Sequence, residues 1–210
     1  MILADIGNSY FHIYDGEKIE HLTYEDAIDK YGDEALYYIT VKHQLTSQIE
    51  EIKNWKNISS QVKIKGEYNT MGVDRKALCL SQVNGIFVDA GSAITVDVVE
   101  NSIYIGGFIL PGLKAYIESY KTISSALDIE LNKAVNLEDL PTTTKDGISY
   151  GIIASIKALI DKHSDGKNSN NRKLYFTGGD GKFLSQYFEE AVYDEMLVFD
   201  GMRKVIECMG

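Results

Sequence analysis

The chain has 210 residues, 44% of them hydrophobic and only two of them cysteine, a composition that fits a globular protein and indicates neither a disulfide framework nor a structural zinc site. Its 31 acidic side chains outnumber the 21 basic ones and give a formal net charge of −10, which argues against nucleic-acid binding because that function needs a basic face. No apolar run approaches the length of a membrane span and Asp5 interrupts any leader, so we expect a cytoplasmic protein without a membrane segment.

The chain opens with an apolar strand that runs into an acid and a glycine turn. Residues 2–6 are followed by a glycine, an asparagine and a serine at 7–9, and then by a second β-rich run over 10–14. A glycine with small polar neighbours lets backbone N–H groups approach an anion, and Asp5 could hold a hydrated metal ion at the strand end. Taken alone, the pattern also fits an ordinary hairpin with an aspartate beside its turn.

The same arrangement recurs 84 residues later. An apolar run over 86–88 leads into Asp89, Gly91 follows two places on, and an alternating run covers 94–99. Two copies of one strand–turn–strand unit predict two structurally similar halves. If the two turns face each other, they form a cleft suited to the phosphates and cations of a nucleotide. A chance resemblance between two hairpins is the alternative.

The other expected elements alternate between strands and helices, which indicates an α/β fold. Helices are expected where apolar residues recur at helical spacing, and strands where β-branched and aromatic residues alternate or cluster. The expected strands are 17–22, 36–41, 61–65, a β run within 103–112, 173–176 and 195–199; the expected helices are 24–31, 44–55, 76–80, 113–127, 145–163, one ending near 188, and 201–208.

Asp74 and Arg75 stand where a loop enters the helix over 76–80. One interpretation is an acid that complements the helix dipole beside a solvated arginine, but this leaves Arg75 at the unfavourable, positive end of the helix. The other is a carboxylate and a guanidinium that grip a substrate hydroxyl and a polar group. Spacing alone leaves both interpretations open.

Two further features bear on function. The strand over 173–176 runs into a third glycine-rich turn at 177–181, which is suited to packing beside a flat base or a ribose. The helix over 113–127 carries an apolar stripe that fits either the core or a subunit interface. The four histidines show no ligand spacing and receive no role.

In their order along the chain, these motifs resemble those of the type III pantothenate kinase family, and the resemblance covers essentially the whole sequence. It implies the duplicated ribonuclease-H-like domains of actin-like ATPases, an α/β fold with mixed β-sheets flanked by helices, here over about 1–84 and 85–210. The stretches that carry the resemblance are Asp5-Ile6-Gly7-Asn8-Ser9, Tyr68, Gly72-Val73-Asp74-Arg75, Asp89-Ala90-Gly91-Ser92-Ala93, Gly106-Gly107-Phe108-Ile109-Leu110-Pro111-Gly112 and Thr177-Gly178-Gly179.

The resemblance implies ATP-dependent phosphorylation of pantothenate on its primary hydroxyl, the first step of coenzyme A synthesis. Asp74 matches the family's catalytic base, which takes the hydroxyl proton. Thr144 matches a threonine that reaches the substrate of the partner subunit, so the resemblance implies a homodimer. The residues that match pantothenate contacts are Tyr68, Gly72, Val73, Asp74, Arg75 and Thr144.

The resemblance also implies how ATP and its cations are held. Asp5 matches a residue near the divalent metal, Mg²⁺ or a similar ion, which it would contact through water. Asp89 matches a ligand of a monovalent cation, K⁺ or NH₄⁺. The residues that match ATP contacts are Asp5, Ile6, Gly7, Asn8, Ser9, Tyr10, Ser92, Thr177, Gly178 and Gly179.

A few positions depart from the family pattern. Ser9 and Ser92 replace customary threonines, Thr70 stands where a proline is frequent, and Gly147 stands where an alanine is usual. None of these changes removes a reactive group. Two alternatives stay open: another small-molecule kinase on the same fold, and a regulatory accessory protein related to the family.

Overall fold

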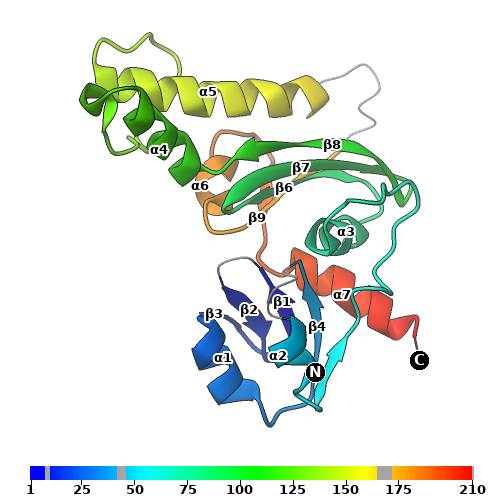
Figure 1. The fold of residues 1–210 in the computed structure, drawn as a ribbon. Helices are drawn as coiled ribbons and strands as arrows, with labels where there is room; N and C mark the ends of the chain where they lie inside the picture. Colours follow the sequence, from blue (N-terminus) through cyan, green and yellow to red (C-terminus); the bar gives the residue numbers. More distant parts are fainter. Residues whose placement is uncertain (8–9, 42–45, 165–171, 210) are drawn as a thin grey trace. The chain divides into compact units, whose positions relative to one another are not determined.

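The structure is a computed structural model that describes residues 1–7, 10–41, 46–164 and 172–209 (Figure 1). The chain folds into two compact units. The first comprises Met1–Val83, Val99–Ile105 and Glu195–Gly210, and the second comprises Asn84–Val98 and Gly106–Asp194. The last segment of the chain therefore lies with the first unit, whereas the sequence-based division grouped it with the second.

The first sheet has five strands. They are β1 (Ile2–Ile6), β2 (Phe11–Tyr14), β3 (Ile19–Leu22), β4 (Leu36–Thr40) and β5 (Trp55–Asn57), in the spatial order β3-β2-β1-β4-β5. The first three strands form an antiparallel meander, and β4 and β5 are parallel to β1. Because parallel strands share one direction, the carboxyl end of β1, which carries Asp5, meets that of β4 at the same edge.

The second sheet repeats this order. Its strands are β6 (Gly85–Ala90), β7 (Ala93–Glu100), β8 (Ile103–Pro111), β9 (Leu174–Thr177) and β10 (Val192–Tyr193), in the spatial order β10-β9-β6-β7-β8. After the three consecutive strands β6, β7 and β8, strand β9 pairs in parallel with β6, and β10 pairs in parallel with β9. The shared order confirms the predicted α/β fold with two similar sheets.

Helices cover both faces of the first sheet. On one face α1 (Tyr24–Tyr31) and α2 (Thr46–Glu50) enclose a core that includes Phe11 and Trp55, whose indole N–H donates to the Tyr31 carbonyl at 3.0 Å. Helix α1 begins where the predicted pattern places it, because the Thr23 hydroxyl caps the Asp26 N–H at 3.2 Å.

The other face packs against α3 (Val73–Leu80) and α7 (Leu197–Glu207), which contact β4 and β1 respectively. The two helices also pack on each other. A Cβ at Gly201 would lie 1.8 Å from the Ala77 carbonyl oxygen, so only glycine permits this approach. The Lys204 ammonium donates to the Ser81 carbonyl at 2.6 Å and ties α7 to the end of α3.

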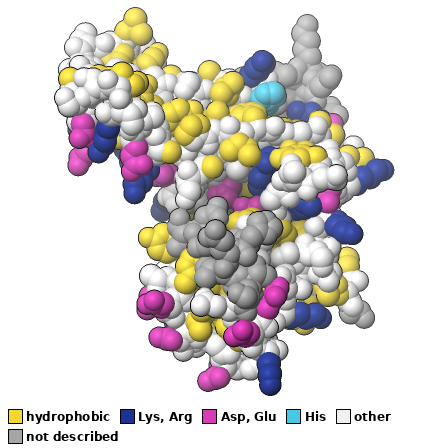
Figure 2. Space-filling view, in the orientation of Figure 1, with side chains coloured by type: hydrophobic (Ala, Val, Ile, Leu, Met, Phe, Trp, Pro, Cys, Tyr) yellow, Lys and Arg dark blue, Asp and Glu magenta, His cyan; other side chains and the backbone are white. Residues whose placement is uncertain are grey.

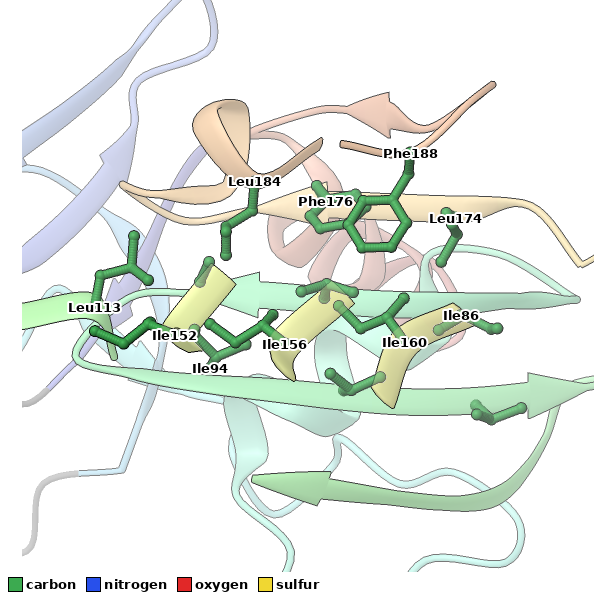
Figure 3. Close-up of a cluster of buried hydrophobic side chains, with 14 of the residues drawn as sticks. Ile86, Ile94, Leu113, Ile152, Ile156, Ile160, Leu174, Phe176, Leu184 and Phe188 are labelled. Carbon is green, nitrogen blue, oxygen red and sulfur yellow. The ribbon is translucent and has the colours of Figure 1, made fainter. Parts of the chain in front are cut away.

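The second unit carries α4 (Leu113–Ile123), a short 3₁₀ turn (Ser125–Leu127), α5 (Thr144–Ser164) and α6 (Gly181–Ser185). Helix α5 runs along the sheet (Figure 1). Its apolar side chains point into a cluster formed with Ile86, Ile94 and Phe176 of the strands (Figure 3). The α5 side of the contact consists of Ile148, Ile152, Ile156 and Ile160.

Three predicted elements are wrong. The expected strand over 195–199 is a turn followed by the first residues of α7, in which Leu197, Val198, Gly201 and Met202 are buried at helical spacing. Packing against α3 and β1 makes this segment helical. The expected strand over 61–65 is not a strand, and only Lys65 makes an isolated bridge, to Ile103. Of the expected helix over 44–55, residues 44–45 lie outside the described residues, and α2 ends at Glu50; Trp55 instead begins β5 and fills the first core.

Strand β10 was not predicted. No helix in the described part of the chain is both long and apolar enough to cross a membrane.

Candidate active site

The two glycine turns predicted from the repeat have the same construction. Asp5 and Asp89 are each the next-to-last residue of the first strand of their sheet. The Gly7 N–H donates to the Tyr10 carbonyl at 3.1 Å, and the Gly91 N–H donates to the Ala93 carbonyl at 2.9 Å, so the second turn is one residue shorter. Each strand therefore brings a half-buried carboxylate to the base of a tight turn.

The remaining residues of the first turn differ in what they offer a ligand. Ile6 is fully buried in the first core, so only its backbone can reach one. Tyr10 is 52% exposed. Asn8 and Ser9 lie outside the described residues.

Tyr24 supports this turn and was missed by the sequence reasoning. Its hydroxyl donates to the Gly7 carbonyl, and its ring stands edge-on against Phe11 at 4.8 Å between centroids. The contact spans 17 residues of sequence. The sequence signal was an aromatic residue directly after the Thr23 cap, which by itself indicates only packing.

The loop-to-helix junction at Asp74 is shaped by a glycine. Asp74 lies in the first turn of α3, and its carboxylate accepts the Arg75 backbone N–H at 2.8 Å. A Cβ at Gly72 would lie 2.4 Å from the Asp74 Oδ1 atom. Gly72 is therefore needed for the carboxylate to lie back over the turn, where the partial positive charge of the helix end stabilises it.

Arg75 is buried, not solvated. It is 5% exposed, its Nη1 donates to the Tyr68 hydroxyl at 2.6 Å and its Nη2 to the Tyr104 hydroxyl at 3.4 Å. The interpretation of Arg75 as a solvated surface residue is wrong. A buried guanidinium between two phenols is a prepared site for a polar or anionic group. Tyr104 was not predicted, because an alternating β run gives no sign that one of its side chains meets Arg75.

A charged pair holds the loop before this junction. The Glu67 carboxylate accepts the Ile64 N–H at 2.7 Å and pairs with the Lys76 ammonium at 2.8 Å. Partial burial alone would raise the pKa of Glu67, but Lys76 and the Ile64 N–H outweigh it and hold that pKa below its usual range. The Met71 N–H donates to the Tyr68 carbonyl at 3.0 Å, which closes the turn that carries Tyr68.

The second unit has its own cluster around Asp89. In the register of β6 and β9, Asp89 lies opposite Thr177. The next residue, Gly178, has a φ of +83°. A Cβ at Gly178 would lie 2.4 Å from the Asp89 Oδ1 atom and 2.6 Å from the Ala90 carbonyl oxygen. The glycine thus leaves a cradle beside the Asp89 carboxylate that any side chain would fill.

Ser92 and Gly179 are exposed. Ser92 lies in the second turn, and its carbonyl accepts a hydrogen bond from the Gly112 N–H at 3.2 Å. Thr144 is exposed at the start of α5, and the helix is capped instead by Thr143, whose hydroxyl accepts the Asp146 N–H at 3.1 Å. The Thr144 side chain is therefore not used as the cap.

The described residues contain no group of three or more His, Cys, Asp or Glu side chains placed to hold a metal ion. This donor set does not fit an all-protein metal cage. It fits Mg²⁺, which usually takes one or two carboxylates and completes its octahedron with water and substrate phosphates. Asp5 is a carboxylate of that kind. The Asp89 carboxylate and the Ala90 carbonyl oxygen, which both lie beside Gly178, are oxygen donors that could hold an alkali cation.

Two histidines without predicted roles meet in the first unit. The register places His12 opposite Asp5 on β1 and opposite His21 on β3, and the two Nδ1 atoms are 2.6 Å apart. Burial lowers the pKa of His12 to about 4, and His21 adds to the shift while Glu195 opposes it. The missed signal was the alternation of two hairpin strands, which brings residues nine apart together.

The structure thus assembles the predicted residues in part. It brings Arg75 together with Tyr68, and Asp89 together with Thr177 and Gly178. The described residues of the predicted set divide between the units: Asp5, Ile6, Gly7, Tyr10, Tyr68, Gly72, Val73, Asp74 and Arg75 lie in the first, and Asp89, Ser92, Thr144, Thr177, Gly178 and Gly179 in the second.

Comparisons with known proteins agree on one family. The family model described as type III pantothenate kinase matches residues 41–165. The type III pantothenate kinase of Campylobacter jejuni is 41% identical over 207 residues, which cover 99% of this chain and 97% of that protein.

Solved structures extend the comparison. A Campylobacter jejuni protein described as a conserved member of the Baf family of transcriptional activators has a TM-score of 0.87 at 39% identity, covering 100% of this chain and 98% of that one. A Sinorhizobium meliloti protein described as a 2-dehydro-3-deoxygalactonokinase has a TM-score of 0.60 at 11% identity, covering 99% and 98% of the two chains, and shares the fold alone.

Proposed function

The chain belongs to the type III pantothenate kinase family, and from this premise we propose the roles of its residues in the phosphorylation of pantothenate by ATP. The reaction transfers the terminal phosphoryl group of ATP to the primary hydroxyl of pantothenate in coenzyme A biosynthesis. The observation that carries this function is the 41% identity over 99% of the chain. We propose that the reaction takes place in the cytoplasm.

Asp74 is the proposed catalytic base. Its carboxylate lies at the amino end of α3, half-buried and next to Arg75. In a loose phosphoryl-transfer transition state the hydroxyl loses its proton late, so an ordinary carboxylate that orients the hydroxyl is sufficient. Tyr68, Gly72, Val73 and Arg75 then bind pantothenate, and the buried guanidinium of Arg75 supplies fixed donors for its polar groups.

The ATP phosphates are proposed to lie against the two glycine turns. Backbone N–H groups of the 5–10 segment and the Ser92 hydroxyl approach the phosphates, because a turn with glycine lets a ligand come close to the backbone. Thr177, Gly178 and Gly179 line the nucleoside side.

Cations complete the charge balance of this site. The chain carries a formal charge of −10 and no P-loop lysine, so neutralising charge on the phosphates must come partly from bound ions. Asp5 is proposed to hold Mg²⁺ through water, and Asp89 to hold K⁺ or NH₄⁺ beside Gly178. When bound, these ions supply the positive charge that a phosphoryl-transfer transition state requires.

A homodimer is proposed for the active form. Thr144 is exposed and does not cap its helix, so its hydroxyl remains available to the pantothenate of a second copy. Hydrophobic side chains gather over the part of the second unit that carries α4 and α5 (Figure 2). Ile109, Ile123 and Leu140 are 58%, 70% and 81% exposed, and an apolar surface of this kind is typical of subunit interfaces.

A transcriptional role is the second candidate, because one similar solved structure is described as a transcriptional activator. The charge of −10 disfavours direct DNA binding. The intact Gly72–Arg75 loop also favours catalysis, since a purely regulatory protein has no need of a buried arginine beside a carboxylate base. Growth of cells that lack pantothenate kinase, with this chain supplied, separates the two.

The direct test is ADP release from ATP with and without pantothenate, repeated with Na⁺ in place of K⁺. We expect ADP release that requires pantothenate and falls in Na⁺. A panel of sugars, acetate and other alcohols run in parallel tests the acceptor. ADP release with another acceptor but none with pantothenate would overturn the assignment. Equal rates in Na⁺ and K⁺ would contradict the proposal that Asp89 holds a monovalent cation.

A further inference from the structure

We propose that the hydroxyl of Tyr104 is a positioning group for pantothenate, because it fixes the Arg75 guanidinium beside Tyr68. The inference rests on the proposed function and adds a residue to its substrate site. Neither the motif pattern nor the family resemblance pointed to Tyr104. Its role follows from three contacts within the first unit.

The first contact is the hydrogen bonding of the Arg75 guanidinium to two phenol hydroxyls. Arg75 Nη1 lies 2.6 Å from the Tyr68 hydroxyl and Nη2 lies 3.4 Å from the Tyr104 hydroxyl. A planar guanidinium that donates from both terminal nitrogens to fixed acceptors has one orientation. Because Arg75 is 5% and Tyr104 6% exposed, water competes little for the hydrogen bond between these two side chains.

The second contact anchors Tyr104 itself. Its backbone N–H donates to the Lys65 carbonyl at 2.8 Å. Gly66, at a φ of +90°, packs so closely that a Cβ there would lie 2.4 Å from the Tyr104 carbonyl oxygen. The backbone of Tyr104 therefore holds the loop that leads to Tyr68, whereas its hydroxyl holds Arg75.

The third contact distinguishes the two tyrosines. The centroids of their rings are 6.1 Å apart, but Tyr68 is 41% exposed and Tyr104 is only 6% exposed. Tyr68 is accessible to a ligand, whereas Tyr104 is buried. Tyr104 therefore acts on pantothenate through Arg75, and it is a positioning residue, not a catalytic one.

Tyr104→Phe is the test, because it removes the hydroxyl and leaves the ring and the backbone anchor. We expect the KM for pantothenate to rise about three- to tenfold, since a hydrogen bond to a buried charged group is lost. The kcat and the KM for ATP should stay within about twofold of wild type, because Arg75 remains and the nucleotide side is untouched.

Tyr31→Phe is the matched control. Tyr31 lies in the same unit, is 5% exposed, and its hydroxyl also has a charged partner: it donates to the Glu20 carboxylate at 3.1 Å, whereas the Tyr104 hydroxyl accepts from Arg75. Both variants lose one buried hydroxyl with a charged partner, but only Tyr104 contacts Arg75. We expect Tyr31→Phe to keep the wild-type KM for pantothenate.

A double-mutant cycle identifies the route of the effect. Lysine at position 75 lacks the planar fork whose two terminal nitrogens reach the two phenols, so Tyr104→Phe should change the KM little further in an Arg75→Lys background. A full additional effect there would overturn the inference. The inference would also be overturned if Tyr104→Phe lowered kcat and the unfolding temperature and raised both KM values to a similar extent. It would likewise be overturned if the Tyr104→Phe chain did not fold while the Tyr31→Phe chain did.

The outcomes separate this inference from the function on which it rests. If the wild-type chain releases no ADP with pantothenate, the proposed roles fail as a whole. If the wild type is active and Tyr104→Phe keeps its KM for pantothenate, only the role of Tyr104 fails.

Discussion

The Asp74 carboxylate lies above Gly72 and at the amino end of α3. We expect Asp74→Asn to lower turnover roughly 10²-fold or more, because the amide cannot accept the hydroxyl proton. ATP binding should stay largely intact. Steady-state ADP release together with a direct measurement of ATP binding checks this.

Asp26→Asn is a suitable control for that variant, since Asp26 also lies in the first turn of a helix in the same unit. Asp26→Asn removes an acidic side chain from the first turn of a helix but touches no catalytic residue, so its turnover should stay near wild type. If Asp74→Asn turns over at the wild-type rate, Asp74 is not the base.

His12 gives the first unit a pH dependence of defined sign. Its pKa is lowered from 6.5 to about 4 in the folded chain, so the unfolded chain takes up the proton first as the pH falls. The stability from neutral His12 is complete above pH 6.5 and is lost between pH 6.5 and about 4. That difference amounts to about 3 kcal/mol as an order of magnitude.

Urea unfolding over this pH range checks the sign. His12→Gln cannot be protonated, so its free energy of unfolding should fall less steeply with decreasing pH than that of the wild type. His163→Gln, on α5, should keep the wild-type slope. Parallel curves for wild type and His12→Gln would contradict the lowered pKa.

At the level of elements, the junction of β9 with its glycine turn depends on one backbone conformation. We expect Gly178→Ala to lower the free energy of unfolding by about 2 kcal/mol or more, since alanine at a φ of +83° is strained and its Cβ meets Asp89 and Ala90. Gly179→Ala should change it by less than about 0.5 kcal/mol, because a Cβ there meets nothing within 4 Å. Denaturant unfolding of both variants measures the contrast, and equal losses would refute it.

The elements also differ in how far local sequence decides them. The hairpins around Gly7 and Gly91 were predictable, because an apolar run, an acid and a glycine specify a strand end and a tight turn locally. Helix α7 was not, because Leu197-Val198-Phe199 suits a strand or a helix equally well. Its packing on α3, through Gly201, makes it a helix.

For the molecule as a whole, the proposed dimer makes the most direct prediction. Ile123→Glu places a charge on a 70% exposed apolar residue of α4, so a dimer built on that surface should dissociate. Light scattering should then give the mass of one chain, 23.5 kDa, where the wild type gives twice that value. Pantothenate kinase activity should fall with it, because Thr144 of the second copy is lost.

Val83→Glu is the control, since Val83 is 55% exposed but lies in the first unit. It should keep the wild-type mass and activity. Hybrid dimers give an independent check: Asp74→Asn and Thr144→Ala chains, each weakly active, should regain activity when mixed, because one site of the hybrid holds both intact residues. No gain on mixing would contradict the shared site.

Local sequence was sufficient for the two-fold plan of this chain and for its family. The repeated acid–glycine turn, the Gly72–Arg75 junction and the glycine-rich end of β9 are short patterns whose meaning lies in a few adjacent residues, and backbone sterics and turn chemistry act over that range. The shared strand order of the two sheets confirms the plan, and the comparisons confirm the family.

Contacts between distant residues were decided only by the folded chain. Arg75 meets Tyr104 across 29 positions, Tyr24 reaches Gly7 across 17, and α7 returns to pack on α3 from the far end of the sequence. Such contacts depend on which faces are buried together, and burial is a property of the packed core that no local window contains. The buried state of Arg75, on which the proposed substrate site rests, therefore became visible only in the tertiary structure.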